Sequence, residues 1–360
     1  MTTEMKRYLA LGGLALAASA SAVLLPATML TAKPVYAANL LINGAGATFP
    51  APLYAKWFSE YQKAHPEVHV NYQAIGSGGG IKQVIERTVD FGATDAPMNA
   101  EELAKAPGVL HLPTVLGAVV VTYNQPGFAQ LKLTPETLAG IFLGKITKWN
   151  DPAIAKDNPG ALPAASIAVV HRSDGSGTTA VFTDYLSKVS PEWKTQVGAG
   201  KSPSWPAGLG GKGNDGVTGL VKSTAGSIGY VELAYANQNK LPVAALKNHD
   251  GNFVEPSLET ISAAAAGALV PEDFRVSITD APGKDAWPIS AFTYLLIHKD
   301  AADAQKGAAL ADLLWWAVHD GQALAAPLDY APLPKPLVAR VETALKSLTV
   351  QGKPALVHGR

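Results

Sequence analysis

The segment Ile167-Ala-Val-Val-His-Arg-Ser-Asp-Gly-Ser-Gly-Thr-Thr179 runs directly into the amphipathic segment Ala180-Val-Phe-Thr-Asp-Tyr-Leu-Ser-Lys188. Its first four residues are apolar and β-branched enough to form a buried strand, and the second segment has the pattern of a helix. A strand followed by a glycine- and hydroxyl-rich turn and a helix aims free backbone N–H groups at an anion. We therefore expect this turn to bind an anion, and phosphate is the first hypothesis.

The side chains of this turn suit an oxyanion. Arg172 can add a planar, charge-assisted fork of N–H donors. Glycines let the main chain approach a ligand closely, and hydroxyls offer further donors; these residues are Gly175, Ser176, Gly177, Thr178 and Thr179. His171 is a neighbour of the turn, and we expect it to be structural rather than a contact.

The rest of the chain repeats the alternation of strand, turn and helix. This alternation predicts an α/β fold with parallel strands. Strand-like runs are followed by small-residue turns and helical patterns in the first hundred residues; the strands are 40–43, 68–72 and 89–95, and the helices are 53–61 and 81–87.

Further elements are expected later in the chain. Two long apolar runs, 109–123 and 287–297, are extended in character and could cross between lobes. Helices are expected at 134–141, 257–269 and 301–326, and residues 208–216 are expected to form a loop.

Composition restricts the class of protein. A chain of 360 residues suggests two lobes, and 48% apolar residues fit a packed globular protein. The formal net charge is zero, so nothing suggests nucleic acid or an anionic membrane surface as a partner. There is no cysteine, which excludes thiol catalysis, disulfides, cysteine metal sites and a lipidated cysteine.

The first 37 residues have the pattern of a secretory signal. Lys6 and Arg7 precede an apolar run, 8–25, and Val35-Tyr-Ala37 offers small residues to a signal peptidase. The run is also about long enough to span a bilayer, so an uncleaved anchor is the alternative. We expect removal of residues 1–37, with cleavage after Ala37 preferred over cleavage after Ala22, and a soluble periplasmic protein without a lipid anchor.

Several other functional motifs are incomplete in this sequence. Gly211-Lys212 is followed by Gly213, so the chain has no nucleotide P-loop there. Gly44-x-Gly46 lacks the third glycine of a dinucleotide site, and Ser176 does not lie in the Gly-x-Ser-x-Gly elbow of a hydrolase. The histidines are scattered, so we expect no metal site.

Three turns share one design. Residues 47–49, 76–78 and 175–178 each place hydroxyl and small residues just before an expected helix. Any one of them is explained by helix capping alone, because Ser and Thr are favoured at that position. All three in one α/β chain favour convergence on an anion, although spacing alone does not show that they meet.

Asp95 and Asp174 are the notable acids. The ordinary interpretation of each is a turn aspartate. Beside a bound anion, however, a carboxylate can discriminate: it accepts the O–H of protonated phosphate, whereas sulfate has no such proton. A site built for a hydroxyl can reject the analogue that lacks it by roughly 10⁴–10⁵. Arg172 would offset the acidic charge.

The sequence also resembles a known family. The motifs that carry the likeness are Gly44-Ala-Gly-Ala-Thr-Phe-Pro-Ala-Pro-Leu-Tyr-Ala-Lys-Trp57, Gly76-Ser-Gly-Gly-Gly-Ile-Lys-Gln83, Val89-Asp-Phe-Gly-Ala-Thr-Asp-Ala-Pro97 and the turn from Arg172 to Thr179. They resemble those of the periplasmic phosphate-binding proteins of Pst-type phosphate ABC importers. Landmarks at 144–149, 208–216 and 285–289 extend the resemblance over essentially the whole mature chain.

The resemblance implies a two-lobed periplasmic binding protein of the type II, Venus-flytrap kind. Each lobe would be a mainly parallel sheet flanked by helices, and two strand crossovers would form the hinge. Lobe I would comprise residues 38–114 and 287–360, and lobe II residues 115–286. The implied function is high-affinity binding of inorganic phosphate and its delivery to the inner-membrane permease subunits of an ABC importer. No catalysis, cofactor or metal is implied, and we expect a monomer.

The resemblance also implies the contacts of the ligand. From the first lobe they would be Thr48, the backbone of Phe49, Ser77, Gly78 and Asp95. From the second lobe they would be Arg172, Ser176, Gly177 and Thr178, with Asp174 paired to Arg172. Where the family often has a second serine this chain has Gly78, so backbone donation survives there but the hydroxyl is lost.

Two alternative functions remain at this point. A periplasmic phosphatase or esterase could use Ser176 as nucleophile, although the sequence offers no evident base or metal set. A binding protein for sulfate or another oxyanion would keep the class and change the ligand.

Overall fold

The computed structural model describes residues 39–356 except 127, 129 and 161. These residues belong to one compact unit, Val35–Arg360. The expected signal peptide, residues 1–37, lies outside the described residues, so its cleavage stays a prediction. The lobe boundaries likewise stay a prediction.

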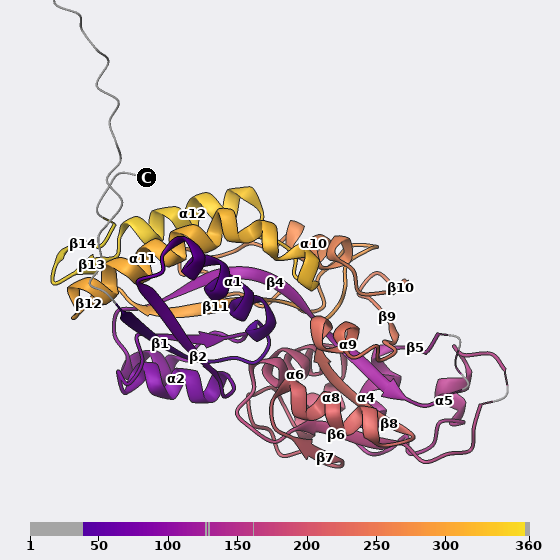
Figure 1. The fold of residues 1–360 in the computed structure, drawn as a ribbon. Coiled ribbons are helices and arrows are strands. Elements are labelled where there is room, and N and C mark those ends of the chain that lie inside the picture. The colour runs from indigo at the N-terminus through magenta and orange to yellow at the C-terminus, as the bar shows by residue number, and fades with distance from the viewer. Residues whose placement is uncertain (1–38, 127, 129, 161, 357–360) are drawn as a thin grey trace, which may run out of the picture. The chain divides into compact units, whose positions relative to one another are not determined.

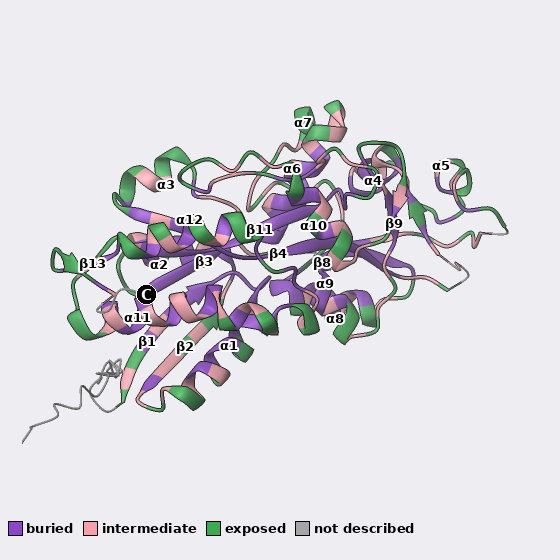
Figure 2. Cartoon of the chain, turned by 90° about the horizontal axis from the view of Figure 1, so that it is seen from above, coloured by how far each residue is buried: buried purple, intermediate pink, exposed green. Residues whose placement is uncertain are grey.

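A central sheet organises the described residues. It contains eight strands in the order β2-β1-β3-β11-β4-β8-β6-β7 among the residues that the structure describes. Their bounds are β1 Leu40–Gly46, β2 Val68–Ala74, β3 Phe91–Thr94, β4 Val109–Asn124, β6 Ala168–Arg172, β7 Leu209–Gly211, β8 Ser227–Glu232 and β11 Ser290–His298. The inner strands of this sheet are largely buried, whereas the edge strands β2 and β7 are more exposed, and exposed residues lie on the outward faces of the helices (Figure 2). The expected α/β fold is confirmed.

Strand β4 is shared by two halves of the sheet. Its residues 109–118 pair with β11, and its residues 119–124 pair with β8. We call β2, β1, β3, β11 and residues 109–118 the first half, and residues 119–124, β8, β6 and β7 the second half. The change of partner within one strand makes β4 a crossover, as the sequence pattern suggested (Figure 1).

Strand direction explains where a site can form. Strands β1, β2 and β3 are parallel to one another, and so are β6, β7 and β8, whereas the β3–β11, β11–β4 and β4–β8 pairs are antiparallel. The carboxyl ends of the two parallel sets therefore point toward each other at the level where β4 changes partner. Ligands of α/β sheets bind at such carboxyl ends.

The second expected crossover begins later than predicted. The apolar run was expected to be extended from residue 287, but β11 starts at Ser290. Pro288 has no N–H to donate to a ladder, and its carbonyl accepts instead from the N–H of Asp280 at 2.7 Å. Ile289 still reaches β4, because its carbonyl accepts from the N–H of Val119 at 2.9 Å.

Helices cover both faces of the sheet. Figure 1 shows α11 and α12 on one side of the first-half strands and α2 on the other. The helices are α1 Ala51–Ala64, α2 Ser77–Ile85, α3 Ala100–Lys105, α4 Pro135–Phe142, α5 Pro152–Ala155, α6 Gly177–Val189, α7 Pro191–Gln196, α8 Gly213–Ser223, α9 Leu233–Gln238, α10 Leu258–Ala266, α11 Ala304–Val318 and α12 Lys335–Lys346. Small sheets join β5 Lys132–Leu133, β9 Ala245–Lys247 and β10 Phe253–Val254, and β12 Asp300–Ala301, β13 Thr349–Val350 and β14 Lys353–Pro354.

The helix expected over 301–326 is wrong at both ends. Asp303 caps the start of α11 by accepting from the N–H groups of Gln305 and Lys306, so the helix begins at Ala304. It ends at Val318, and 3₁₀ turns follow at Asp320–Leu324 and Ala326–Leu328. Gly321 explains the break, because its carbonyl accepts from Trp57 Nε1 at 2.7 Å and thereby ties the chain to α1.

The expected loop 208–216 is also wrong. Its first part is strand β7, and its last residues, from Gly213, form the first turn of α8. Across the described ranges, no helix combines the length and apolar character needed to cross a bilayer.

Candidate functional site

The residues predicted to bind an anion lie where the two halves of the sheet meet. Thr48 follows β1, Asp95 follows β3, and Arg172 is the last residue of β6. Ser77 and Gly177 are the first residues of α2 and α6. The predicted residues therefore come together from segments far apart in the sequence, which capping alone would not require.

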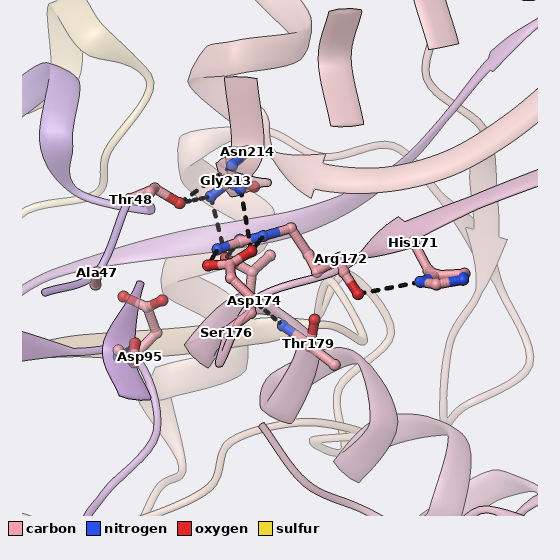
Figure 3. A network of polar contacts seen from close by, with 12 residues as sticks. Ala47, Thr48, Asp95, His171, Arg172, Asp174, Ser176, Thr179, Gly213 and Asn214 are labelled. Atoms are coloured by element: carbon pink, nitrogen blue, oxygen red, sulfur yellow. Dashed lines mark hydrogen bonds and ion pairs between the residues drawn. The ribbon is translucent and has the colours of Figure 1, made fainter. Parts of the chain in front are cut away.

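Arg172 is buried and forms a two-point ion pair with the half-buried Asp174. Nε of Arg172 donates to Oδ1 of Asp174 at 2.8 Å, and Nη2 donates to Oδ2 at 2.6 Å. The Arg172 side chain is 1% exposed. Its remaining Nη1 donates to the Thr178 hydroxyl at 3.4 Å. In Figure 3 the side chains of Arg172 and Asp174 point toward one another, as the pairing implied by the resemblance requires.

The ion pair sets the charge of Asp174. Burial alone would raise the pKa of this carboxyl, but the hydrogen bonds and charge of Arg172 and the Gly213 N–H, which donates to Oδ1 at 3.0 Å, outweigh it. The pKa of Asp174 therefore lies below its ordinary value. The pair is charged but internally neutral, so Asp174 fixes the guanidinium in one orientation.

The surroundings of Asp95 shift its pKa in the opposite direction. It is 3% exposed, and burial raises its pKa to about 7, although the Thr293 hydroxyl, the Arg172 charge and Ser77 act in the lowering direction. Oδ1 accepts from Thr293 Oγ1 at 2.9 Å. Oδ2 is buried and has no hydrogen-bond partner among the described residues. An unpartnered buried carboxylate oxygen is costly unless a ligand completes it.

The N-terminus of α6 faces Asp95. A Cβ added at Gly177 would lie 2.5 Å from Oδ2 of Asp95 and 2.3 Å from Oγ of Ser77. Only a glycine permits this approach of the helix N-terminus to the carboxylate. Ser176 caps the helix, because its Oγ accepts from the Thr179 N–H at 2.9 Å. The Ser176 hydroxyl proton is still available to a ligand.

Gly78 meets the opposite turn through its main chain. Its N–H donates to the Gly175 carbonyl at 2.8 Å, and an added Cβ would lie 3.2 Å from Gly175 Cα. A serine at this position would require the facing turn to shift. The absence of the hydroxyl expected in the family therefore accompanies close packing of the two turns.

Three tyrosine hydroxyls hold the turn after β1. Tyr72 donates to the Ala47 carbonyl, Tyr235 to the Thr48 carbonyl and Tyr330 to the Phe49 carbonyl, each at 2.6 Å. In a planar trans peptide the carbonyl and the following N–H point in opposite directions. The N–H groups of Thr48 and Phe49, which follow the first two of these carbonyls, are thus directed away from the tyrosines that hold the carbonyls, whereas Pro50 after the third has no N–H. The Phe49 ring is fully buried, so this residue can offer only its backbone.

Asn214 belongs to the same network and was missed by the sequence analysis. Its Nδ2 donates to Thr48 Oγ1 at 2.8 Å (Figure 3). The same atom donates to Thr178 Oγ1 at 3.1 Å, so Asn214 joins both halves of the site. The sequence pattern predicts a loop here, whereas α8 begins at Gly213 and its first turn directs Asn214 inward. The signal that could have found it is the unbroken run Gly213-Asn-Asp-Gly216 among the family landmarks.

His171 points away from this network. Its Nδ1 lies 3.0 Å from the Arg172 carbonyl, and its ring stacks on Trp205 at 4.7 Å. The prediction that it is a structural neighbour agrees with this packing. Within the described ranges no cluster of three or more histidine, cysteine or acidic side chains could hold a metal ion.

Known proteins are similar to this chain in sequence. A family model described as a PBP superfamily domain matches residues 25–319. The "Phosphate-binding protein PstS" of Pasteurella multocida is 51% identical over 311 residues, covering 85% of this chain and 90% of that protein. Proteins with the same description from Haemophilus influenzae and Methanocaldococcus jannaschii are 47% and 45% identical, covering 85% and 79% of this chain and 92% and 80% of those proteins.

Solved structures share the fold. A high-affinity periplasmic phosphate-binding protein bound with phosphate aligns with a TM-score of 0.70 at 23% identity, covering 84% of this chain and 93% of that one. A phosphate ABC transporter substrate-binding protein from Clostridium perfringens, described as putative and holding phosphate, aligns with a TM-score of 0.62 at 18% identity, covering 82% and 100%. At these identities the likeness supports the architecture alone.

Proposed function

The chain belongs to the PBP superfamily, among the PstS phosphate-binding proteins, and from this premise we propose that it binds inorganic phosphate and delivers it to the permease of an ABC importer. It is a binding protein and not an enzyme. The observation that carries the proposal is Asp95 Oδ2, a buried acceptor that has no hydrogen-bond partner among the residues the structure describes and that faces the donors of the α6 N-terminus.

The donors come from both halves of the sheet. The proposed contacts are the hydroxyls of Thr48, Ser77, Ser176 and Thr178, the backbone N–H groups of Phe49 and Gly177, and the guanidinium of Arg172. The Gly78 N–H, which the resemblance also implied as a contact, donates to the Gly175 carbonyl instead. Asp174 contributes by holding Arg172 in place, with bonds of 2.6 and 2.8 Å. Asp95 is the acceptor of the set, and its carboxylate accepts a hydrogen bond from the O–H of the ligand.

This arrangement gives a reason for choosing phosphate over sulfate. Near neutral pH phosphate retains an O–H that can donate to a carboxylate, whereas sulfate has only acceptors. Sulfate would leave Asp95 unpaired or facing like charge, and both are costly in a buried site. The same geometry favours tight binding without a basic protein. Charged hydrogen bonds contribute about 1.5–3 kcal/mol each, and micromolar affinity requires about 8 kcal/mol.

The contacts across the site also suggest how binding is signalled. Gly78 donates to Gly175 at 2.8 Å, and Lys201 pairs with Glu102 at 3.0 Å, in each case joining segments of the two halves. A ligand that is bound by both halves stabilises the state in which they are together. We propose lobes of 38–114 with 287–360 and of 115–286, and the closed state is the one that docks on the inner-membrane permease subunits.

The ligand assignment is tested by calorimetry with phosphate and with sulfate. We expect tight binding of phosphate and no measurable binding of sulfate. Replacing Asp95 with Asn should reduce the difference between the affinities for phosphate and for sulfate, because an amide can donate to an oxygen of either anion. Tight binding of sulfate by the unchanged protein would contradict the role of Asp95.

The phosphatase alternative is tested separately. Ser176 Oγ accepts a helix-capping N–H, which does not activate a nucleophile. Incubation with a phosphate monoester should give no sustained release of phosphate. Turnover that is lost in Ser176→Ala would favour the enzyme instead.

The remaining parts of the proposal concern the location and state of the protein. We propose export to the periplasm, removal of residues 1–37 and a monomer. The mass and N-terminal sequence of the mature protein from a periplasmic extract test the first two. Light scattering after gel filtration tests the third.

A further inference from the structure

Asn214 connects hydroxyl groups from the two halves of the site. It is the second residue of α8 and is fully buried. Its backbone N–H donates to Thr48 Oγ1 at 3.2 Å, in addition to the bonds from Nδ2 to Thr48 and Thr178. Nothing in the contacts proposed above gives this residue a role.

The orientation of the Asn214 amide is fixed by its neighbours. Oδ1 accepts from the backbone N–H of Glu232 at 3.0 Å. Because a backbone N–H can only donate, the atom facing it must be the amide oxygen. The NH₂ group is therefore the one directed at the threonines, where it acts only as a donor.

Each of the two threonine hydroxyl oxygens consequently accepts two hydrogen bonds. Thr48 Oγ1 receives the backbone N–H and Nδ2 of Asn214. Thr178 Oγ1 receives Nδ2 of Asn214 and, at 3.4 Å, Nη1 of Arg172. A hydroxyl has two acceptor lone pairs and one proton. When both lone pairs are engaged, the hydroxyl can act toward a further group only as a donor.

We propose that Asn214 is a positioning residue that commits the hydroxyls of Thr48 and Thr178 to donate to the bound tetrahedral oxyanion. The inference rests on the proposed function, because the anion is the acceptor of both protons. An oxyanion such as phosphate offers mainly acceptors, so a hydroxyl that turned its lone pairs toward it would be repelled. Asn214 removes that orientation and ties the two halves together at the same time.

The test compares variants of Asn214 by titration calorimetry with inorganic phosphate. Asn214→Ala leaves both hydroxyls free to rotate, and we expect the affinity to fall by about tenfold to hundredfold, which corresponds to one or two weakened hydrogen bonds. Asn214→Asp keeps the shape and still accepts from Glu232 N–H. Its carboxylate would draw both hydroxyl protons toward itself, so we expect it to bind phosphate more weakly than Asn214→Ala. A residue that only filled space would give the reverse order.

A double-mutant cycle tests hydroxyl orientation with Asn214→Ala alone, which adds no charge to the site. In a protein with Thr48→Val and Thr178→Val, there is no hydroxyl left to orient. Asn214→Ala should then change the phosphate affinity by less than twofold. An unchanged effect of Asn214→Ala in this background would overturn the proposal.

Asn248 provides the matched control. It is also a buried asparagine, 4% exposed, and its Nδ2 donates to the carbonyls of Gly283, Lys284 and Ala286. Asn248→Ala should lower the free energy of unfolding in denaturant and leave phosphate affinity unchanged. If Asn214→Ala behaves in the same way while the unchanged protein binds phosphate tightly, the inference fails and the proposed function stands. If the unchanged protein does not bind phosphate, both fail.

Discussion

Asp95, which is buried, and Asp174, which is half-buried, lie on opposite sides of one site, and their surroundings shift their pKa values in opposite directions. Arg172 satisfies Asp174 through two hydrogen bonds and lowers its pKa. Burial raises the pKa of Asp95 to about 7, because Arg172 acts on it through charge alone. One of its oxygens accepts from a hydroxyl, and the other has no hydrogen-bond partner within the described part of the chain. One side of the site is therefore complete without a ligand and the other is not. The difference shows how a site can hold a charge ready and still discriminate between anions.

The largest effect on this comparison should come from Arg172→Ala. Removing the guanidinium leaves Asp174 as an uncompensated carboxylate beside the anion, and breaking a buried pair costs about 3–5 kcal/mol. We expect phosphate affinity to fall by roughly 10²–10⁴ in calorimetry. Arg275→Ala is the control, because its pair with Asp273 at 2.6 Å is partly exposed. Equal losses in the two variants would contradict the special role of Arg172.

The pH dependence of the free energy of unfolding should distinguish Asp95 from Asp174. The raised pKa of Asp95 means that its contribution is fully present below about pH 4 and is lost as pH rises toward 7. Without phosphate, the stability of the protein relative to Asp95→Asn should decline over that window by on the order of 1 kcal/mol per pH unit. Asp174, whose pKa is lowered, contributes above pH 4 and loses that contribution only in more acidic solution.

The free energies of unfolding of Asp95→Asn and Asp174→Asn, measured in denaturant from about pH 3 to about pH 8, test these opposite pH windows. This pH range spans about the region in which the two carboxyl groups titrate. The unchanged protein is measured at every pH under the same conditions. Identical pH profiles for the two variants would show that the surroundings of the two aspartates do not differ as described.

A smaller effect is expected from Gly177→Ala, which would press the two sides apart. The new Cβ would lie 2.3 Å from Ser77 Oγ and 2.5 Å from Asp95 Oδ2. Overpacking of this kind costs about 1–3 kcal/mol, so phosphate affinity should fall by roughly ten- to hundredfold. Gly219→Ala in α8 meets no atom within 4 Å and should stabilise the helix without changing affinity. Normal binding by Gly177→Ala would mean that the approach is looser than the structure has it.

The smallest effect should come from Tyr235→Phe. This change removes the hydroxyl that donates to the Thr48 carbonyl at 2.6 Å. One hydrogen bond contributes about 0.5–1.5 kcal/mol, so affinity should fall by about two- to tenfold. Calorimetry beside Tyr123→Phe, whose hydroxyl accepts from Leu131 N–H at 3.4 Å outside the site, distinguishes a local effect from a general one.

The sequence predicted the parts of the site that are local in the chain. The strand, turn and helix around Arg172 form within a short segment, and Asp174 is two residues from its partner. Capping residues and glycines announce such a turn, because their conformational preferences act over a few residues. The α/β alternation was readable for the same reason.

The parts that could not be predicted depend on distant segments. Asn214 meets Thr48 across 166 residues, and Tyr330 meets Phe49 across 281 residues. A tyrosine that holds a carbonyl has the same local pattern as a core tyrosine. The end of α11 was missed for a similar reason, since it is set by the contact of Gly321 with Trp57.

The shared strand β4 also has a consequence for the kinetics of folding. Strand β11 lies between β3 and β4 in the sheet. Because β11 is translated late, the first half of the sheet cannot form completely before most of the chain has been synthesised. Thr293, for example, lies 198 residues beyond Asp95, its hydrogen-bond partner. Such long-range pairing raises contact order and slows folding. Slow folding keeps the polypeptide unfolded until most of it has been made. For the exported chain proposed above, this delay favours passage through the membrane as an unfolded chain.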